Sequence, residues 1–319
     1  MFLDAASIMF HNNFSRMSDK SLIHKRPLPQ LDGVLALNKP SGPSSASCLN
    51  LLKRLGQKKI GHAGTLDPLA SGVLIALLGQ ATKLSSWIME AGYKAYKCEA
   101  RLGLTTDTWD IQGETLREED CSHITEDRIK AELELCQGEI EQIVPAFSAA
   151  KHNGQPLYKL ARKGLPTPVK SKTIHIYKAD MLSFSMPFVT FRVICGSGAY
   201  VRSLAHSLGT RLGCGAALSQ LTREYSYPFS LENALDPALV EDNPEIVAEY
   251  AQPLVKALPD WEQVNLSARD AARVRQGRPA PADRPRSPGS MAFLLENGKP
   301  VAIARFADSS WIVQRGLWN

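Results

Sequence analysis

The segment from Gly61 to Leu78 constrains the fold of this chain most strongly, because a turn-rich stretch passes directly into an apolar one. Residues 61–72 have the sequence GHAGTLDPLASG, and residues 73–78 have the sequence VLIALL. An apolar run of this length that is bounded by glycine predicts a buried strand. Pro68 disfavours helical backbone angles at Asp67. The carboxylate is therefore predicted on a loop fixed to the core, where a scaffold can hold a catalytic group; an ordinary structural turn fits the same Asp-Pro pattern.

The rest of the chain contains more predicted strands than helices. The two kinds of element do not alternate regularly, which favours an α+β class with a mixed, largely antiparallel sheet. Near the end of the chain, residues 301–306 and 311–313 fit a small β-barrel. The other expected elements are strands over residues 33–37, 73–78, 96–102 and 188–195 and helices over residues 45–55, 81–91, 126–136 and 200–212.

Composition excludes several classes of protein. The 319 residues are 44% hydrophobic and 22% charged, as in globular proteins, and no apolar run is long enough to cross a bilayer. The six cysteines are scattered without a CxxC pair, which argues against a zinc site and a disulfide framework. Cys214 has no adjacent base and is interpreted as a packing residue. Reduced thiols predict a cytoplasmic protein, and the missing CxxC spacing predicts no metal site.

Positive charge is concentrated at the C-terminus. Residues 261–319 hold nine Lys/Arg and five Asp/Glu, so that +4 of the net charge of +5 lies there and +1 in the other residues. A basic module of this kind indicates contact with phosphates. A merely solvated basic face is the alternative interpretation.

The block at residues 61–72 resembles the catalytic motif of the TruB family of pseudouridine synthases, which form pseudouridine-55 in tRNA. In that family the aspartate of this block is the essential catalytic residue, which implies this role for Asp67. Asn38 stands where the family usually has Asp, and Ala199 where Thr is frequent. Other blocks resemble the family's motifs in the expected order: KPSG (39–42), KAY (94–96), SAAK (148–151), LYKLARKG (157–164), GAYVRSL (198–204) and LSQLTR (218–223).

The resemblance assigns two further catalytic residues. The family's tyrosine stacks on the target uracil and is a proposed general base in some mechanisms, which implies this role for Tyr96. The family's arginine pairs with the catalytic aspartate, so Arg202 would hold the Asp67 carboxylate charged and correctly directed. Without the resemblance, Tyr96 would be interpreted as a core strand residue and Arg202 as an exposed helix residue.

Five residues are implied to bind the substrate. His62 would contact the T loop of tRNA, Tyr200 would line the pocket, and Leu221 would form its apolar wall. From the residues alone, His62 fits a satisfied core histidine and Leu221 a core leucine. The complete implied set is His62, Lys39, Tyr200, Leu221 and Arg223, with Lys39 in a segment that supports the active-site loop.

The resemblance implies isomerisation of a uridine that is first extruded from its stack. No group enters or leaves, so no cofactor is expected. The expected partner is the T stem-loop of tRNA, with no membrane and no obligate protein partner, and the chain is expected to be a monomer. We expect a flexible extension (residues 1–30), a catalytic domain (31–250) and a small RNA-binding, PUA-like domain (251–319).

Three alternatives remain. The chain could bind or fold tRNA without turnover on the same scaffold, or modify another RNA. A hydrolase of small molecules that depends on a cysteine or a carboxylate would need a His/Asp partner spacing that the sequence lacks.

Overall fold

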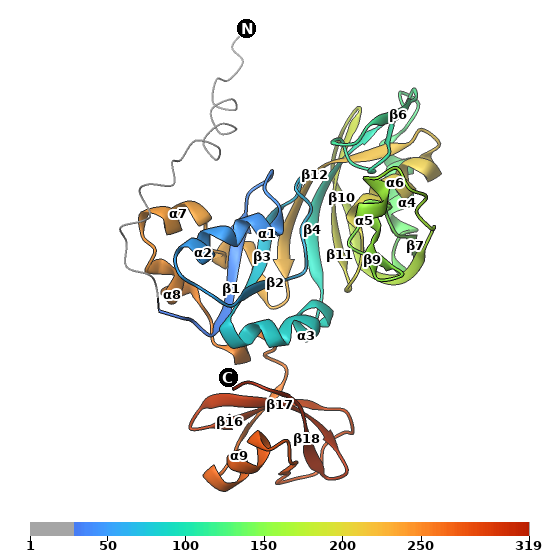
Figure 1. Ribbon diagram of the computed structural model, residues 1–319. Coiled ribbons are helices and arrows are strands. Elements are labelled where there is room, and N and C mark those ends of the chain that lie inside the picture. Colours follow the sequence, from blue (N-terminus) through green and yellow to red (C-terminus); the bar gives the residue numbers. More distant parts are fainter. Residues whose placement is uncertain (1–28, 319) are drawn as a thin grey trace.

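The computed structural model describes residues 29–318, in which a large and a small β-sheet account for most of the strands (Figure 1). The flexible extension predicted for residues 1–30 lies outside the described residues, apart from its last two. The large sheet contains β1 (Gly33–Lys39), β2 (Ile60–Ala63), β3 (Ser71–Leu78), β4 (Lys94–Leu102), β7 (Gly138–Ile143), β10 (Ser171–Ser185), β11 (Phe188–Cys195), β12 (Ala216–Ser226) and β13 (Phe229–Ser230). The small sheet contains β14 (Glu262–Asn265), β15 (Ala280–Pro281), β16 (Met291–Glu296), β17 (Lys299–Ala307) and β18 (Ser310–Gly316).

Short elements connect these strands. Two ribbons are formed by β5 (Leu104–Thr106) with β6 (Thr115–Glu118) and by β8 (Lys151–His152) with β9 (Gln155–Pro156). The helices are α1 (Ser45–Cys48), α2 (Asn50–Arg54), α3 (Ser85–Glu90), α4 (Glu126–Glu134), α5 (Leu157–Ala161), α6 (Val201–Leu212), α7 (Pro237–Asp242), α8 (Ile246–Tyr250) and α9 (Ala268–Arg275), with 3-10 turns η1 (Gly79–Leu84), η2 (Leu231–Asn233) and η3 (Leu254–Ala257). None of these helices is long and apolar enough to span a membrane.

The predicted α+β class and largely antiparallel sheet are confirmed. The main path of the large sheet runs β1-β3-β12-β4-β11-β10-β7, and its neighbours are antiparallel except for β3 and β12. These two central strands pair in parallel over only two residues, Ser71 with Thr222 and Gly72 with Arg223. The single parallel contact therefore lies at the start of β3, directly after the Asp67 loop.

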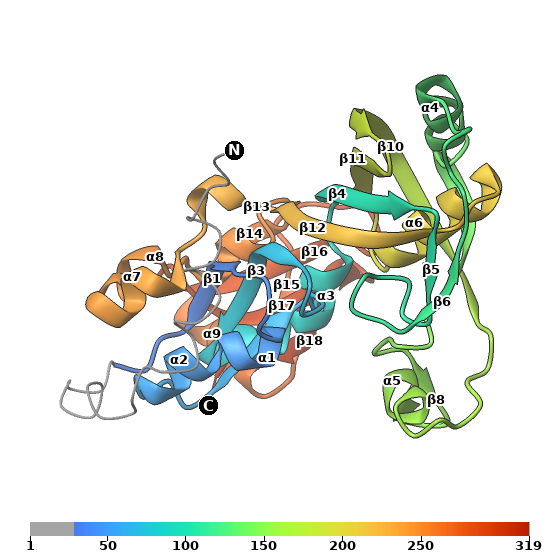
Figure 2. The same cartoon turned by 90° about the horizontal axis from the view of Figure 1, so that it is seen from above.

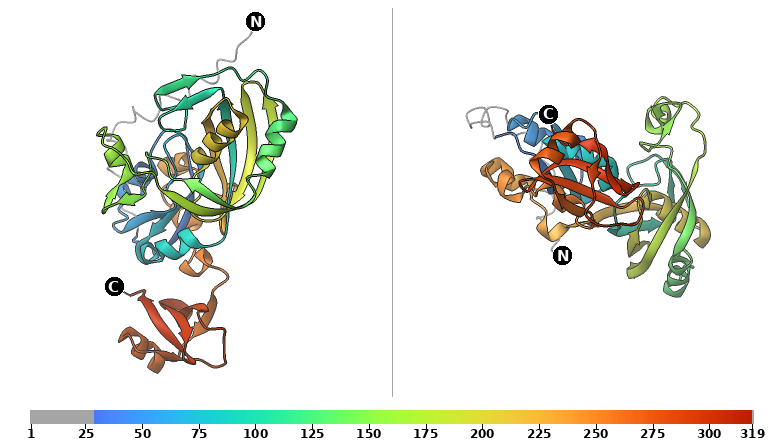
Figure 3. Two further views of the ribbon diagram at one scale, coloured as in Figure 1. Left: turned by 90° about the vertical axis from the view of Figure 1, so that its right-hand side faces the viewer. Right: turned by 90° about the horizontal axis from the view of Figure 1, so that it is seen from below.

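The two faces of the large sheet pack against different elements. One face buries Leu35, Leu74 and Tyr96 against apolar residues of α1, α2, α4 and α6. The opposite face buries Ile75 in a cluster that includes Phe293 of the small sheet. Seen from the side and from below, the small sheet lies under the β1 and β3 half of the large sheet (Figure 1, Figure 3).

Local signals explain where the helices begin and end. The Ser44 side chain accepts a hydrogen bond from Ser47 N at the start of α1, and Gly213 ends α6 with a left-handed φ of 83°. The helix predicted over residues 45–55 is divided at Leu49 into α1 and α2. The helix predicted over residues 81–91 begins as the 3-10 turn η1 and continues as α3.

From the edge of the sheet that ends in β7 and β10, the segment with β8, β9 and α5 extends outward (Figure 2).

Gly72 is required by the parallel contact between β3 and β12, and we predict that Gly72→Ala is costly. A Cβ atom here would lie 2.3 Å from Arg223 O, and the φ of 99° is itself unfavourable for alanine. We expect a loss of about 2–3 kcal/mol in the free energy of unfolding, measured by urea denaturation. Gly298→Ala is the matched control, because Gly298 has a φ of 75° with nothing within 4 Å of the added atom. Equal losses in the two variants would contradict the close contact.

Candidate active site

Asp67 lies in the loop between β2 and β3, and a tight turn begins at this residue. The amide of Ala70 donates to Asp67 O at 3.1 Å, which closes the turn over Pro68 and Leu69. The Asp67 side chain is 39% exposed. The loop therefore presents a carboxylate to solvent from a short connection whose two ends are paired strands.

The last residue of β1 and the segment that follows it hold this loop in place. Lys39 is 0% exposed, and its Nζ donates to Ala70 O at 2.6 Å, to Pro40 O at 2.9 Å and to Pro68 O at 3.3 Å. Ser45 Oγ donates to Leu66 O at 2.9 Å and accepts from Leu66 N at 2.8 Å. Two more hydrogen bonds join the same segments, from Gly42 N to Pro68 O and from Ser41 Oγ to Leu69 O.

Burial makes Lys39 an unusual lysine. Desolvation lowers the pKa of Lys39 from 10.5 to about 8, although the nearby Cys48 and Asp67 side chains act in the opposite direction. The ammonium is held mainly by backbone carbonyls, which accept hydrogen bonds from it but do not neutralise its charge. Lys39 therefore fixes the shape of the loop at a cost in desolvation.

We predict that Lys39 makes stability increase with pH above about 8. Because its pKa is lower in the folded chain, the unfolded chain binds more protons between about pH 8 and 10.5, and unfolding becomes less favourable as pH rises through this window. The free energy of unfolding of the wild type minus that of Lys39→Met should increase by about 2–3 kcal/mol between pH 7 and pH 10. Urea denaturation at both pH values measures this difference, with Lys299→Met as a control for loss of an exposed lysine. A constant or decreasing difference would contradict the prediction.

Arg202 joins three loops through one buried guanidinium. It lies in the first turn of α6, and its side chain is 5% exposed. Its Nε donates to Asp67 Oδ2 at 2.8 Å, one Nη donates to Thr108 O at 3.0 Å, and the other donates to Phe147 O at 2.9 Å. The ion pair that the resemblance implies between Arg202 and Asp67 is therefore present, although 135 residues separate the partners.

Asp110 is a second carboxylate beside Arg202, and it is not among the site residues that the resemblance implies. Its Oδ2 lies 3.8 Å from Arg202 Nε, and its side chain is 9% exposed. Its Oδ1 accepts hydrogen bonds from Thr108 Oγ1 at 2.9 Å and from Gln112 N at 3.0 Å. The pattern Thr106-Asp107-Thr108-Trp109-Asp110 contained the signal, because threonine and aspartate at this spacing bond to their own loop.

Arg223 supports the opposite end of the Asp67 loop. It is 1% exposed and donates from Nε to Val73 O at 2.7 Å and from one Nη to Gly64 O at 2.9 Å. Tyr96 is the antiparallel partner of Arg223 in β4 and is 7% exposed. Burial raises the pKa of the Tyr96 hydroxyl, and the adjacent Arg223 opposes this shift.

The other predicted binding residues come from separate elements: Tyr200 precedes α6, Leu221 lies in β12 and His62 lies in β2. Tyr200 precedes α6, and its backbone is held on both sides by the buried Gln142, which accepts from Tyr200 N at 2.7 Å and donates to Tyr200 O at 3.0 Å. Leu221 of β12 is 7% exposed and packs in the same apolar cluster as Leu66 and Tyr96. His62 lies in β2 with a buried Nδ1 that has no partner among residues 29–318, and burial lowers its pKa.

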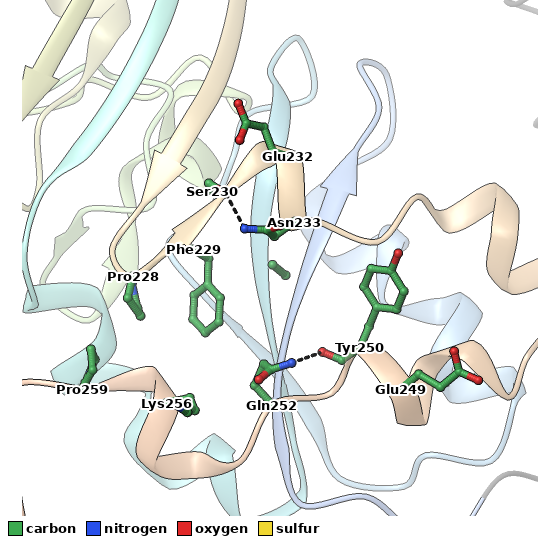
Figure 4. Close-up of a pocket in the computed structure, with 11 residues that line it drawn as sticks. Pro228, Phe229, Ser230, Glu232, Asn233, Glu249, Tyr250, Gln252, Lys256 and Pro259 are labelled. Carbon is green, nitrogen blue, oxygen red and sulfur yellow. Dashed lines mark hydrogen bonds between the residues drawn. The ribbon is translucent and has the colours of Figure 1, made fainter.

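A separate pocket lies away from these residues. It has a volume of about 620 Å³ and lies between β1, the β12–β13 turn, η2, α8 and η3 (Figure 4). Phe229 and Tyr250 line it together with Glu232, Glu249 and Lys256, and none of the predicted site residues does. Across the described chain, no group of three or more His, Cys, Asp or Glu side chains could hold a metal ion.

The chain is similar to known proteins over most of its length. Residues 53–201 match the family model described as TruB family pseudouridylate synthase (N terminal domain). A tRNA pseudouridine synthase B from Oleidesulfovibrio alaskensis is 55% identical over 303 residues, which cover 92% of this chain and 98% of that protein. A protein of the same name from Pseudomonas aeruginosa is 37% identical, with 92% and 98% covered.

Solved structures show the same fold. A Cbf5-Nop10-Gar1 complex contains a chain that is 25% identical, with a TM-score of 0.65 and coverage of 90% of this chain and 85% of that one. An H/ACA RNP bound to a substrate RNA containing 2′-deoxyuridine contains a chain with a TM-score of 0.67 and 24% identity over the same shares. The similarity extends over both sheets, because 90% of this chain is covered.

Proposed function

Because this chain belongs to the TruB family of pseudouridylate synthases, we propose that it converts uridine to pseudouridine in tRNA through the carboxylate of Asp67. The observation that carries this proposal is the asymmetric environment of the carboxylate. Oδ2 is held by Arg202 at 2.8 Å, whereas no residue between 29 and 318 donates a hydrogen bond to Oδ1. One oxygen is thus fixed by the protein, and the other is available to a substrate.

Conversion of uridine to pseudouridine requires little beyond a carboxylate with one free oxygen. The bond between N1 of uracil and C1′ of the ribose breaks, the uracil turns, and a bond forms between C5 and C1′. C5 then loses its proton and N1 takes one up, so that the product is an isomer of the substrate. Nothing is oxidised or reduced, so the balance of the reaction calls for no cofactor. Attack at C1′, attack at C6 and a glycal route through loss of the C2′ proton all place a carboxylate against the extruded nucleoside.

We assign the remaining site residues to two roles. We propose that the ring of Tyr96 stacks on the uracil and that His62, Tyr200 and Leu221 surround the base. Lys39 and Arg223, which the resemblance places among the substrate-binding residues, are instead assigned to positioning. Their charged groups are buried and donate to backbone carbonyls of the Asp67 loop and of β3.

The proposed target is uridine-55 in the T loop, and the proposed second contact is the C-terminal domain, residues 251–319. Within residues 261–319, four of the five acidic residues (Glu262, Asp270, Asp283 and Glu296) form ion pairs with arginines of the same segment. Five basic residues of residues 261–319 have no ion pair within the described chain: Arg269, Arg278, Lys299, Arg305 and Arg315. This excess of positive charge supports contact with RNA phosphates.

We further propose that residues 31–250 form the catalytic domain and that the chain acts as a monomer without an obligate protein partner. Asp67, Thr108 and Phe147 accept from all three nitrogens of the Arg202 guanidinium, so this ion pair needs no group from a second protein. The six cysteines are free thiols, which fits a cytoplasmic protein.

Tritium release from tRNA transcripts labelled at C5 of uridine tests the function. We expect release by the wild-type protein from a complete transcript, and none when the target uridine of the T loop is replaced by cytidine. Binding of both transcripts without release from either would indicate a tRNA-binding or folding protein, or a synthase for another RNA. Release from both would place the target elsewhere in the tRNA.

A further inference from the structure

Trp109 occupies a backbone conformation that is costly for its side chain. Its φ is 63°, in the left-handed region that glycine and asparagine adopt most readily. Gly42, Gly64 and Gly72 provide glycine at other left-handed positions near the site, whereas the loop between β5 and β6 carries the bulkiest side chain. A strained residue of this kind points to a local role for its ring.

The two neighbours of Trp109 are groups that hold Arg202. Thr108 provides the carbonyl that accepts from one Nη of Arg202, and Asp110 provides the carboxylate 3.8 Å from Nε. The left-handed turn at Trp109 is what brings both toward the same guanidinium. The loop is also joined to β12, because Leu218 N donates to Trp109 O at 3.0 Å and Ile111 N donates to Leu218 O at 3.0 Å.

The indole ring of Trp109 stacks on His206. The ring centroids are 4.4 Å apart and the ring planes differ by only 4°. His206 follows Arg202 by four residues in α6, so the two side chains lie on the same side of the helix. The stack therefore joins the loop and the helix that the guanidinium also joins.

The His206 side chain takes part in the stack without a competing hydrogen bond at its ring nitrogen Nδ1. This atom is buried and has no hydrogen-bond partner among residues 29–318. Burial lowers the pKa of His206, which favours a neutral imidazole and adds no positive charge beside Arg202. The His206 side chain therefore acts in this contact as a neutral aromatic ring that packs against the indole.

We propose that the Trp109–His206 stack is a positioning device for catalysis, which holds the strained loop against α6 so that Arg202 directs Oδ2 of Asp67. The inference rests on the proposed function, because it assigns a role in that reaction. Neither ring touches the reacting atoms in this proposal. Removing the stack lets the loop relax, Arg202 loses its aligned partners, and the Asp67 carboxylate is no longer fixed while the RNA surface remains.

Single-turnover assays test the proposal, with excess protein and a T stem-loop RNA labelled at C5. Trp109→Gly removes the ring and relieves the left-handed backbone, so it does not add strain. We expect its rate constant to decrease roughly tenfold to a hundredfold, with the Kd for RNA within about twofold of wild type. His206→Ala should show the same pattern, and Trp109→Phe, which keeps a ring, should recover most of the rate.

The double variant Trp109→Gly/His206→Ala distinguishes a stack from two separate effects. We expect it to be about as slow as the slower single variant, because either change alone removes the stack. Tyr177→Ala is the control, since it removes a ring paired with His175 on β10 and should leave the rate constant unchanged. Multiplied losses in the double variant, an unchanged rate in Trp109→Gly, or a change in Kd alone would overturn the proposal. No release by the wild type would instead overturn the proposed function.

Discussion

Replacing Asp67 with asparagine is expected to abolish pseudouridine formation while leaving the fold and RNA binding intact. The substitution keeps the shape of the side chain, and the asparagine oxygen can still accept from Arg202 Nε. It removes the negative charge, and with it the nucleophile or base on Oδ1. We expect the single-turnover rate constant to decrease on the order of 10⁴-fold or more.

The structure explains why this variant should remain folded. Asp67 is 39% exposed, so its charge contributes little to stability. Arg202 keeps Asp110 at 3.8 Å and the two carbonyl acceptors, and its charge is not left unpaired. Thermal melting and RNA binding close to wild type would show that the loss is chemical.

Asp120→Asn is the matched control for this prediction. Asp120 is exposed beyond the end of β6 and accepts a hydrogen bond from Ser122 N, which an asparagine oxygen can also accept. The control should retain nearly full activity in the same tritium-release assay. Release by Asp67→Asn at a similar rate would remove Asp67 from the mechanism and leave the ion pair with a structural role.

The sequence predicted the parts of the fold that depend on local pattern. The apolar run at residues 73–78 and the β-forming residues at 188–195 became β3 and β11, and Gly213 ended α6 as expected. The strands β10 and β12 were not predicted, although both are longer than any strand that was. In β10, only Ile174, Ile176 and Ala179 are buried, so the strand lacks a regular apolar alternation.

β12 was not predicted because a buried charged residue lies within it. Its centre carries Arg223, whose charge is incompatible with a buried strand unless the guanidinium finds acceptors. Those acceptors are Val73 O and Gly64 O, which lie about 150 residues earlier in the chain. A pattern within one segment contains no information about such partners.

The same limit applies to the roles of charged residues. A sequence shows that Lys39 and Arg223 are charged but not that they are buried, and surface exposure is the usual state of such residues. The resemblance implied that both contact the substrate, and nothing in the local sequence spoke against exposed side chains. Only the folded chain shows that their nitrogens point to carbonyls of the Asp67 loop and of β3.

Arg202 is expected to be the second most sensitive residue of the site, and its loss should affect both stability and catalysis. Arg202→Met removes the donor that fixes Asp67 Oδ2, and it leaves the Asp110 carboxylate, which is 9% exposed, without its cation. An uncompensated buried charge costs several kcal/mol, so we expect the free energy of unfolding to decrease by about 3 kcal/mol. The single-turnover rate constant should decrease on the order of 10²- to 10³-fold, because the carboxylate is no longer directed.

A second substitution separates these two effects. In Arg202→Met/Asp110→Asn the buried charge is gone, so urea denaturation should show that part of the lost stability returns. Activity should not return, because no group in the double variant fixes Asp67. Arg202→Lys should also remain slow, since one ammonium cannot replace three directed donors to Asp67, Thr108 and Phe147. Recovery of the rate together with the stability would mean that Arg202 acts only by keeping the loops folded.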